Sequence, residues 1–288
     1  MTTVLITGAG GFIARHLAQT LTAAGIRVLG ASHSGAAGTS YARVFQASLG
    51  ETLLAVLASE RVDAVVHTAL AEGADAYRVN VDGTSRWLDE ARAAGVRLQI
   101  FLSTLSAEPG ALADYGRAKW VLQKRFVEAD EVVFRLGVVV GDGGMYARIR
   151  SSATRAPVVP LLDGGQQLLY VAGVDTVCAV LRDAVLTGGA GLRGVAWNLV
   201  QPEPVTLRAM AAAINRLAGR RALLLPVPAL PVLAALEIAE RVPLLRLPVT
   251  STNVRGLIQQ GQRRFPSDFE RFGHPAQSLE TLIALAGS

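Results

Sequence analysis

Strand-like and helix-like segments alternate through the first half of the chain, and this order constrains the fold more than any other feature. The strand-like segments are short continuous runs of apolar residues, whereas the segments between them have the apolar period of a helix. Continuous apolar strands that alternate with helices form a parallel sheet covered on both faces. We therefore predict an α/β fold with a doubly wound parallel sheet. Strands are expected at Val4–Thr7, Arg27–Ala31, Asp63–Thr68, Leu98–Leu102 and Glu131–Leu136, and helices at Ala14–Ala24, Gly50–Ser59, Val79–Ala94 and Tyr115–Glu128.

The first strand-like run ends in a glycine-rich segment, and an amphipathic helix pattern follows it directly. A glycine turn between a strand and a helix lets backbone N–H groups approach a pyrophosphate at the positive end of the helix. The spacing here differs from the G-x-G-x-x-G pattern, but its place between a buried strand and a helix predicts a dinucleotide site in a Rossmann-type fold. The residues expected to bind the cofactor at this turn are Gly8, Gly10, Gly11, Phe12, Ile13 and Arg15.

The alternation ends after Gly141, where Gly, Pro and Arg become frequent. Helix patterns at Val174–Leu186, Leu207–Ala218 and Pro231–Arg241 dominate the second half. We predict a dinucleotide-binding domain at residues 1–141, to which a segment at about residues 170–200 returns. Residues 142–288 are expected to form mainly a smaller, mostly helical substrate lobe.

Composition and charge limit the class of protein. Hydrophobic residues make up 51% of the chain and charged residues 18%, which allows a sizeable buried core. The formal net charge is +5, but Lys and Arg are scattered, and no basic run is longer than a pair such as Arg220-Arg221 or Arg263-Arg264. A nucleic-acid partner is therefore not expected.

The single cysteine, Cys178, excludes an intramolecular disulfide and a zinc site built on cysteines, so we expect no metal there and a small buried side chain. The first strand begins almost at Met1 without a secretory signal, which predicts a cytoplasmic protein.

The longest apolar stretch runs over residues 222–236 and is interrupted by Pro226, Pro228 and Pro231. It is too short and too broken to cross a bilayer, so we expect a loop and a helix of the lobe and no membrane partner. A membrane-surface contact or a contact in a homodimer is the alternative.

The second predicted strand ends in Ser32-His33-Ser34, with no carboxylate. NAD enzymes usually place an Asp or Glu at this point to hold the ribose 2′-OH. Without that charge, a 2′-phosphate meets no repulsion, and Arg15, Ser32, His33 and Ser34 can supply donors. The sequence therefore favours NADP over NAD as cofactor.

Tyr115 and Lys119 lie one turn apart on one face of a predicted helix. A free tyrosine has a pKa near 10 and is a poor general acid or base at neutral pH. A lysine one turn away favours the phenolate and can also bind a nicotinamide ribose. Upstream, the hydroxyl residues Ser103 and Thr104 follow a predicted strand and could hydrogen-bond a substrate carbonyl.

Together with the glycine turn, these residues make the chain resemble the extended or atypical short-chain dehydrogenase/reductase family, its epimerase/dehydratase group. The resemblance spans nearly the whole chain, and the order of its motifs is more specific than any one of them. The supporting segments are Thr7–Ala14, Val65–Ala69, Asn80–Thr84, Ser103-Thr104, Tyr115–Lys119, Arg135–Gly141, Val174–Val177 and Pro275–Leu282.

The resemblance implies a role for each matching residue. Tyr115 would be the proton donor and acceptor, Lys119 its pKa-lowering and ribose-binding partner, and Thr104 the hydroxyl that orients the carbonyl, with Ser103 in reserve. Asn80 matches a structural and proton-relay position. Three further positions, Thr68, Ala69 and Gly137, would line the cofactor with backbone atoms.

Departures from the family pattern narrow the activity. Leu105 and Ser106 stand where dehydratases carry an Asp-Glu pair, which disfavours water elimination. Gly137 replaces the usual proline, and Ser48 stands where the family has an Asp that contacts adenine.

The substrate end of the site also departs from the pattern. Leu168-Leu169-Tyr170 stands where sugar-nucleotide enzymes often carry a phosphate-binding arginine. Arg148, Arg150 or Arg155 could still meet a diphosphate. Because the lobe is rich in Leu, Val, Ala and Pro, we expect a small-molecule substrate less charged than a nucleotide sugar.

Three functions are weighed on this basis. The leading hypothesis is an NAD(P)-dependent oxidoreductase that transfers hydride at a C–OH/C=O centre, with Tyr115 moving the proton. The alternatives are a nucleotide-sugar epimerase with tightly bound NAD, and a non-catalytic cofactor-binding protein. The intact Tyr115/Lys119 pair argues against the last.

Overall fold

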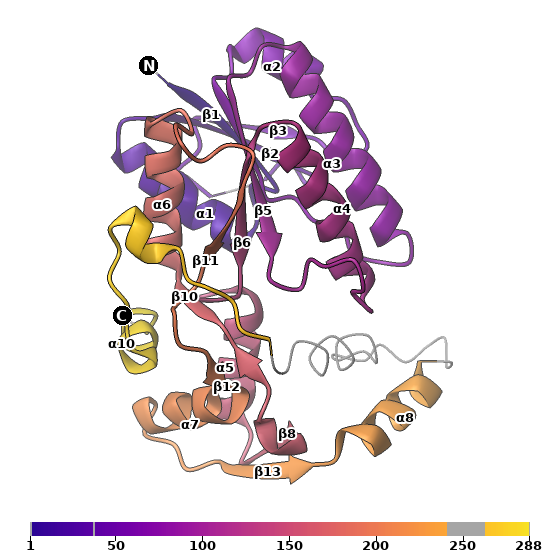
Figure 1. Cartoon of the computed structure of the whole chain (residues 1–288), viewed down its shortest axis with the longest axis vertical. Helices are drawn as coiled ribbons and strands as arrows, with labels where there is room; N and C mark the ends of the chain where they lie inside the picture. Colours follow the sequence, from indigo (N-terminus) through magenta and orange to yellow (C-terminus); the bar gives the residue numbers. More distant parts are fainter. Residues whose placement is uncertain (1, 37, 241–262, 288) are drawn as a thin grey trace. The chain divides into compact units, whose positions relative to one another are not determined.

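A computed structural model describes residues 2–36, 38–240 and 263–287 (Figure 1). The chain divides into two compact units. Unit 1 comprises Met1–Pro109, Asp114–Leu136 and Val174–Leu199, and unit 2 comprises Gly110–Ala113, Gly137–Gly173 and Val200–Ser288. The boundary expected at residue 141 therefore falls inside unit 2, and the segment that returns to unit 1 begins at Val174.

Unit 1 contains a seven-stranded sheet in the order β11-β6-β5-β4-β1-β2-β3, with every neighbouring pair parallel. From β1 the chain runs outward through β2 to β3 and then crosses back to β4, so the strand order reverses between β1 and β4. Ligands of such sheets bind outside the carboxyl ends of the strands at this point. The strands are β1 (Thr3–Thr7), β2 (Arg27–Ser32), β3 (Arg43–Gln46), β4 (Ala64–His67), β5 (Leu98–Thr104), β6 (Val132–Leu136) and β11 (Ala196–Leu199).

Helices cover both faces of this sheet, as Figure 1 shows. The pair α1 and α6 lies on one face, and α2, α3 and α4 lie on the other. The helices of unit 1 are α1 (Phe12–Ala23), α2 (Leu54–Glu60), α3 (Ala76–Ala93), α4 (Asp114–Glu128) and α6 (Val174–Leu186). The predicted doubly wound α/β fold is confirmed.

Burial explains the strand pattern read from the sequence. Val4, Leu5 and Ile6 of β1 are fully buried because helices pack on both faces of the strand. On the face of α2 and α3, Trp87 packs with Leu5 and Leu53 in one core cluster.

Unit 2 combines helices with three two-stranded sheets, β10-β7, β12-β9 and β13-β8. Its core joins Tyr146, Met210, Ile214 and Leu282. Among the described residues its helices are α5 (Gly144–Arg155), α7 (Leu207–Leu217), α8 (Ala229–Ala239) and α10 (Leu279–Leu285), with short 3₁₀ turns at Asp163–Gly165 and Phe269–Phe272. The strands are β7 (Val138–Val140), β8 (Val158–Leu162), β9 (Leu168–Leu169), β10 (Val171–Gly173), β12 (Val205–Thr206) and β13 (Leu223–Val227).

Within the described residues, no helix is long and apolar enough to cross a membrane, and no group of His, Cys, Asp and Glu could hold a metal ion. Cys178 is buried and free, and burial raises the pKa of its thiol to about 12. The helix expected at Pro231–Arg241 corresponds to α8, but Arg241 lies outside the described residues.

Candidate cofactor and catalytic site

The glycine turn joins β1 to α1 at the point where the strand order reverses. Gly8 has φ +70°, and a Cβ there would lie 2.7 Å from the Ala69 Cα, so a side chain does not fit. The Gly11 N–H donates to the Gly8 carbonyl (2.8 Å) and closes the turn. Gly11 is the N-cap of α1 and carries no side-chain cap.

The first-turn amides of α1, which include those of Phe12 and Ile13, are therefore left for a ligand. With no acidic side chain in that turn, the positive end of the helix suits a pyrophosphate. The residues present thus fit the diphosphate of a dinucleotide.

Thr68 and Ala69 lie directly against this turn. The Thr68 hydroxyl donates to the Thr7 carbonyl (2.6 Å), and the N–H groups of Thr68 and Ala69 donate to the Thr7 hydroxyl (3.2 and 3.3 Å). These bonds fix the end of β4 beside the end of β1. The sequence placed Thr68, Ala69 and Gly8 at one site, and the structure brings them together.

Asn80 on α3 braces the segment that follows β4. Its Nδ2 donates to the carbonyls of Ala71 (2.8 Å) and Ala76 (2.6 Å), and its Oδ1 accepts from the Ala71 N–H (2.9 Å). Asn80 is buried. These contacts fix the segment after β4, and the role that the resemblance implies for Asn80 stays a prediction.

The segment after β2 carries no carboxylate, because Glu51 is the first acidic residue of the chain. His33 and Ser34 of this segment are exposed, and so is Arg15 on α1. Ser32 is buried, and its hydroxyl donates to the Ala36 carbonyl (2.9 Å). The Ser34 Oγ accepts from the Ala36 N–H (3.3 Å). Of the four predicted phosphate donors, Ser32 and Ser34 are therefore held by local hydrogen bonds.

The alternation of side chains along β5 determines which of its two hydroxyl residues, Ser103 or Thr104, faces the predicted catalytic tyrosine. Successive side chains of a strand point to opposite faces, and the strand extends to Thr104, two residues beyond the predicted end. Ser103 is buried, and its hydroxyl donates to Gln123 Oε1 on α4 (2.8 Å). Thr104 lies within hydrogen-bond reach of Tyr115 instead, so Thr104 and not Ser103 faces the phenol.

Tyr115 stands in the first turn of α4. The residue is 45% exposed, and burial raises the pKa of its phenol, while the hydrogen bond with Thr104 lowers it. The phenol is therefore protonated at neutral pH. Thr104 Oγ1 also lies 3.1 Å from Ser106 Oγ and accepts from the Ser106 N–H (3.3 Å), which holds the hydroxyl in place.

Lys119 is almost wholly buried, one turn further along α4. Its Nζ donates to the Leu102 carbonyl (2.7 Å) and lies 4.5 Å from the centre of the Phe101 ring. Burial lowers the pKa of this lysine to about 8. The ammonium thus remains charged at neutral pH, and only one of its three protons is used by Leu102.

Polar groups beneath the site were not singled out from the sequence. His67 at the end of β4 is 2% exposed, and its Nε2 lies 2.9 Å from Gln99 Oε1. Burial lowers the pKa of His67 to about 4, so the ring is neutral. The signal for this pair was a glutamine, Gln99, in an otherwise apolar strand.

The remaining predicted residues lie in unit 2. Gly137 is placed between β6 and β7, where a Cβ would come 2.1 Å from the Tyr170 carbonyl oxygen. Arg150 donates to the Ala286 carbonyl (3.4 Å), and Arg148 and Arg155 are exposed. Leu169 is buried in the core of that unit.

The fold and this site define a nucleotide-cofactor enzyme of the short-chain dehydrogenase/reductase type. Residues 4–127 match the model of the NAD dependent epimerase/dehydratase family. This match confirms the resemblance to that family and the expectation of an enzyme of the short-chain dehydrogenase/reductase type. A comparison with curated proteins gave no match.

Solved structures of similar fold include three UDP-glucose 4-epimerases. The protein from Bifidobacterium longum, in complex with NAD+ and UDP, has a TM-score of 0.73 at 17% identity, covering 99% of this chain and 97% of that chain. The protein from Stenotrophomonas maltophila, with bound NAD and formylated UDP-arabinopyranose, gives 0.72 at 16%, with coverage of 99% and 97%. The protein from Thermotoga maritima, with UDP-glucose, gives 0.69 at 19%, with coverage of 79% and 86%.

Proposed function

We propose that this protein is an NAD(P)-dependent oxidoreductase that interconverts a carbonyl and an alcohol. The observation that carries the proposal is the group at the carboxyl end of β5, where the Tyr115 hydroxyl meets Thr104 and Lys119 follows on the same helix. This group belongs to the same unit as the glycine turn. A cation, a phenol and a second hydroxyl are the residue types that proton transfer to a carbonyl oxygen requires.

In the direction of reduction, the protonated Tyr115 donates its proton to the substrate oxygen while the carbonyl carbon gains a hydride. Thr104 holds that oxygen beside the phenol, and Lys119 stabilises the phenolate that remains until water returns the proton. The nicotinamide ring, when bound, supplies or accepts the hydride. In oxidation the same groups act in reverse.

Substitution of Tyr115 by Phe tests this role. We expect turnover to fall by about 100-fold or more, because the general acid is lost, while the dissociation constant of the cofactor stays the same. Turnover would be followed at 340 nm over a panel of carbonyls and alcohols. Tyr77→Phe on the exposed side of α3 is the matched control, and full turnover of the Tyr115 variant would refute the assignment.

We also propose that the cofactor is NADP rather than NAD. Support comes from the absence of acidic residues before Glu51 and from the exposed Arg15 and His33 near the end of β2. A carboxylate at position 32 would repel a 2′-phosphate and accept from a free 2′-OH.

Fluorescence titration with NADPH and NADH measures this preference directly. NADPH should bind more tightly to the unmodified protein, and Ser32→Asp should flatten or reverse the difference. Ser59→Asp on α2 adds the same charge at an exposed position and should change neither constant. Equal or NAD-favouring constants in the unmodified protein would contradict the proposal.

A second candidate is epimerisation of a nucleotide sugar, in which one cofactor is oxidised and re-reduced in each cycle. The solved structures of similar fold favour it, because two of them are UDP-glucose 4-epimerases with bound NAD. It predicts that the purified protein retains NAD and converts a UDP-sugar without net change at 340 nm. Cofactor binding with no turnover of any substrate would instead favour a non-catalytic binding protein.

For the substrate we propose a small molecule less charged than a nucleotide sugar. Leu168 and Leu169 replace a phosphate-binding arginine, and Arg150 is engaged by the Ala286 carbonyl within unit 2. Burying a diphosphate without a positively charged partner would cost a free energy on the order of several kcal/mol. The same substrate panel, run with and without UDP-sugars, checks this.

A further inference from the structure

The exposed side of α8 consists entirely of apolar residues. Leu230 is 78% exposed and Ile238 66%. The residues on that side, which recur with the spacing of a helix face, are Leu230, Pro231, Ala234, Ala235 and Ile238. We call this set the α8 stripe. The other side of the helix is also apolar apart from Glu237.

A helix that is apolar around almost its whole circumference normally lies inside a protein core or in lipid. With eleven residues, α8 is about 16 Å long, roughly half the thickness of a bilayer's hydrocarbon core. It therefore does not span a membrane, but it could lie in the surface of one.

The two strands that pair just before α8 continue this character. In the sheet β8-β13, Leu223 pairs with Val158, and Leu225 pairs with Pro160. Leu223 is 60% exposed, Leu225 44% and Val158 41%. The intervening residues of β8, Val159 and Leu161, are buried, so the sheet is apolar on both faces.

Arginines stand at the edge where both parallel strands begin. Arg155 precedes β8, and Arg220 and Arg221 precede β13, where Leu223 N–H donates to the Pro157 carbonyl (2.9 Å). All three are exposed, and within the described part of the chain none has a carboxylate within 4.0 Å.

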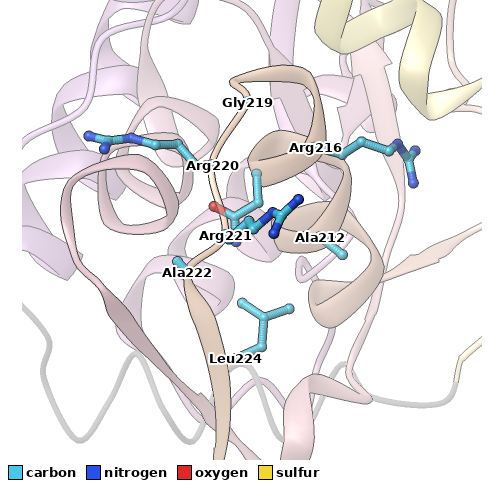
Figure 2. Close-up of a pocket in the computed structure, with 8 residues that line it drawn as sticks. Ala212, Arg216, Gly219, Arg220, Arg221, Ala222 and Leu224 are labelled. Atoms are coloured by element: carbon cyan, nitrogen blue, oxygen red, sulfur yellow. The ribbon is translucent and has the colours of Figure 1, made fainter.

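A hollow of about 500 Å³ lies at this edge and is lined by arginines and apolar residues, with no Asp or Glu (Figure 2). Arg221 stands over the hollow, whereas Arg216 and Arg220 point away from it on either side. Arg216 pairs with Glu280 (2.7 Å). Asn215, also in the lining, is 6% exposed, and its Oδ1 has no hydrogen-bond partner among the described residues.

We propose that this face of unit 2 binds the surface of an anionic phospholipid membrane. The three arginines have no carboxylate partner among the described residues, which favours an anionic partner. The α8 stripe, Leu223 and Leu225 are exposed apolar side chains, which favours a partner that also has an apolar interior. A phospholipid layer offers both, because its phosphates can pair with Arg220 and Arg221 before β13 and its acyl chains can take up the apolar side chains of β13 and α8. This goes against the expectation of no membrane partner, and it does not depend on the proposed activity.

Flotation of the full chain with vesicles tests the proposal. The protein should bind vesicles of phosphatidylcholine with about one third phosphatidylglycerol, and bind pure phosphatidylcholine much more weakly. The double variant Arg220→Gln/Arg221→Gln should bind the anionic vesicles more than tenfold less, at about fivefold per arginine. Leu230→Asn/Ile238→Asn should also weaken binding more than tenfold, because the apolar anchor is lost.

Matched controls lie in unit 1. Leu186→Asn removes an apolar side chain that is 58% exposed, and Arg78→Gln removes an exposed arginine on α3. Both should leave vesicle binding unchanged, and all variants should keep their circular dichroism and cofactor binding.

Several outcomes would overturn the inference. The first is no binding to anionic vesicles, and the second is an equal loss in the control variants. The third is a dimer, seen by analytical ultracentrifugation without lipid, that the α8 stripe variant abolishes while vesicle binding is absent; this would assign the face to a second copy. The fourth is vesicle binding that millimolar inorganic phosphate abolishes and the stripe variant leaves intact, which would assign the arginines to a free anion.

Discussion

At the scale of single residues, Lys119 serves the site at a cost in stability. Burial lowers its pKa from the ordinary 10.5 to about 8, so the folded state binds fewer protons than the unfolded state between these values. The free energy of unfolding therefore rises with pH over this interval. At neutral pH the buried charge costs about 3 kcal/mol, at 1.36 kcal/mol per pKa unit.

Replacing Lys119 by Met should therefore stabilise the fold while reducing activity. We expect a gain of about 2 kcal/mol at pH 7, since the lost hydrogen bond to Leu102 offsets about 1 kcal/mol. The gain should disappear as the pH approaches 10.5. Urea unfolding at several pH values measures it, with the exposed Lys124→Met on the same helix as control. A gain that is the same at pH 7 and pH 10.5 would contradict the prediction.

The sequence indicated Tyr115, Lys119 and Thr104 because their motifs lie in an ordered series. It could not separate Thr104 from Ser103, because that choice depends on where β5 ends. It also did not indicate His67 and Gln99 as a buried pair, since they come from different strands and meet only when the register of the sheet is known.

At the scale of elements, the segments with a clear local period were predicted to within a few residues, as Val174–Leu186 and α4 show. β3 was missed because it is a half-exposed edge strand with only Val44 and Phe45 between polar ends. β8 and β13 were missed because each is stabilised by a partner far away in the sequence and carries a proline. The local pattern of apolar residues contains no information about such a long-range strand pairing.

The junction of β6 and β7 offers a prediction at this scale. Gly137 stands where the family pattern has a proline, and a Cβ there would come 2.1 Å from the Tyr170 carbonyl oxygen, which also accepts from the Val138 N–H (2.8 Å). Gly137→Ala should destabilise the protein by about 1–3 kcal/mol through overpacking. Thermal unfolding measures this, with the open Gly110→Ala as control. An unchanged melting temperature in the Gly137 variant would contradict the prediction, because it would show that β7 and β10 can move apart to make room for the methyl group.

At the scale of the whole molecule, the alternation of strands and helices was enough to predict the doubly wound sheet of unit 1. After Leu136 the sequence predicted a return to the first unit at about residues 170–200, but it did not give the residues at which the chain crosses. The chain leaves unit 1, returns for α6 and β11, and leaves again, and each crossing depends on long-range pairing rather than on local period. Polar groups buried by this packing affect the stability of the entire fold.

The acid stability of the protein depends on His67 in this way. Burial lowers its pKa from 6.5 to about 4, so between these values the unfolded state binds more protons than the folded state. The free energy of unfolding should therefore fall as the pH drops through 6.5, by about 3 kcal/mol at pH 4. His67→Gln keeps a donor for Gln99 and does not titrate, so it should remove this part of the pH dependence, while His33→Gln, at an exposed position, should not. Urea unfolding of the three proteins from pH 7 to pH 4 measures the difference. Burial raises the pKa of Glu131, so the titration of this carboxyl changes the free energy of unfolding in the opposite direction. The test is therefore the comparison between variants and not the pH dependence of the unmodified protein alone. The same pH dependence in His67→Gln and in the unmodified protein would contradict the prediction, because it would show that the imidazole is protonated in the folded state.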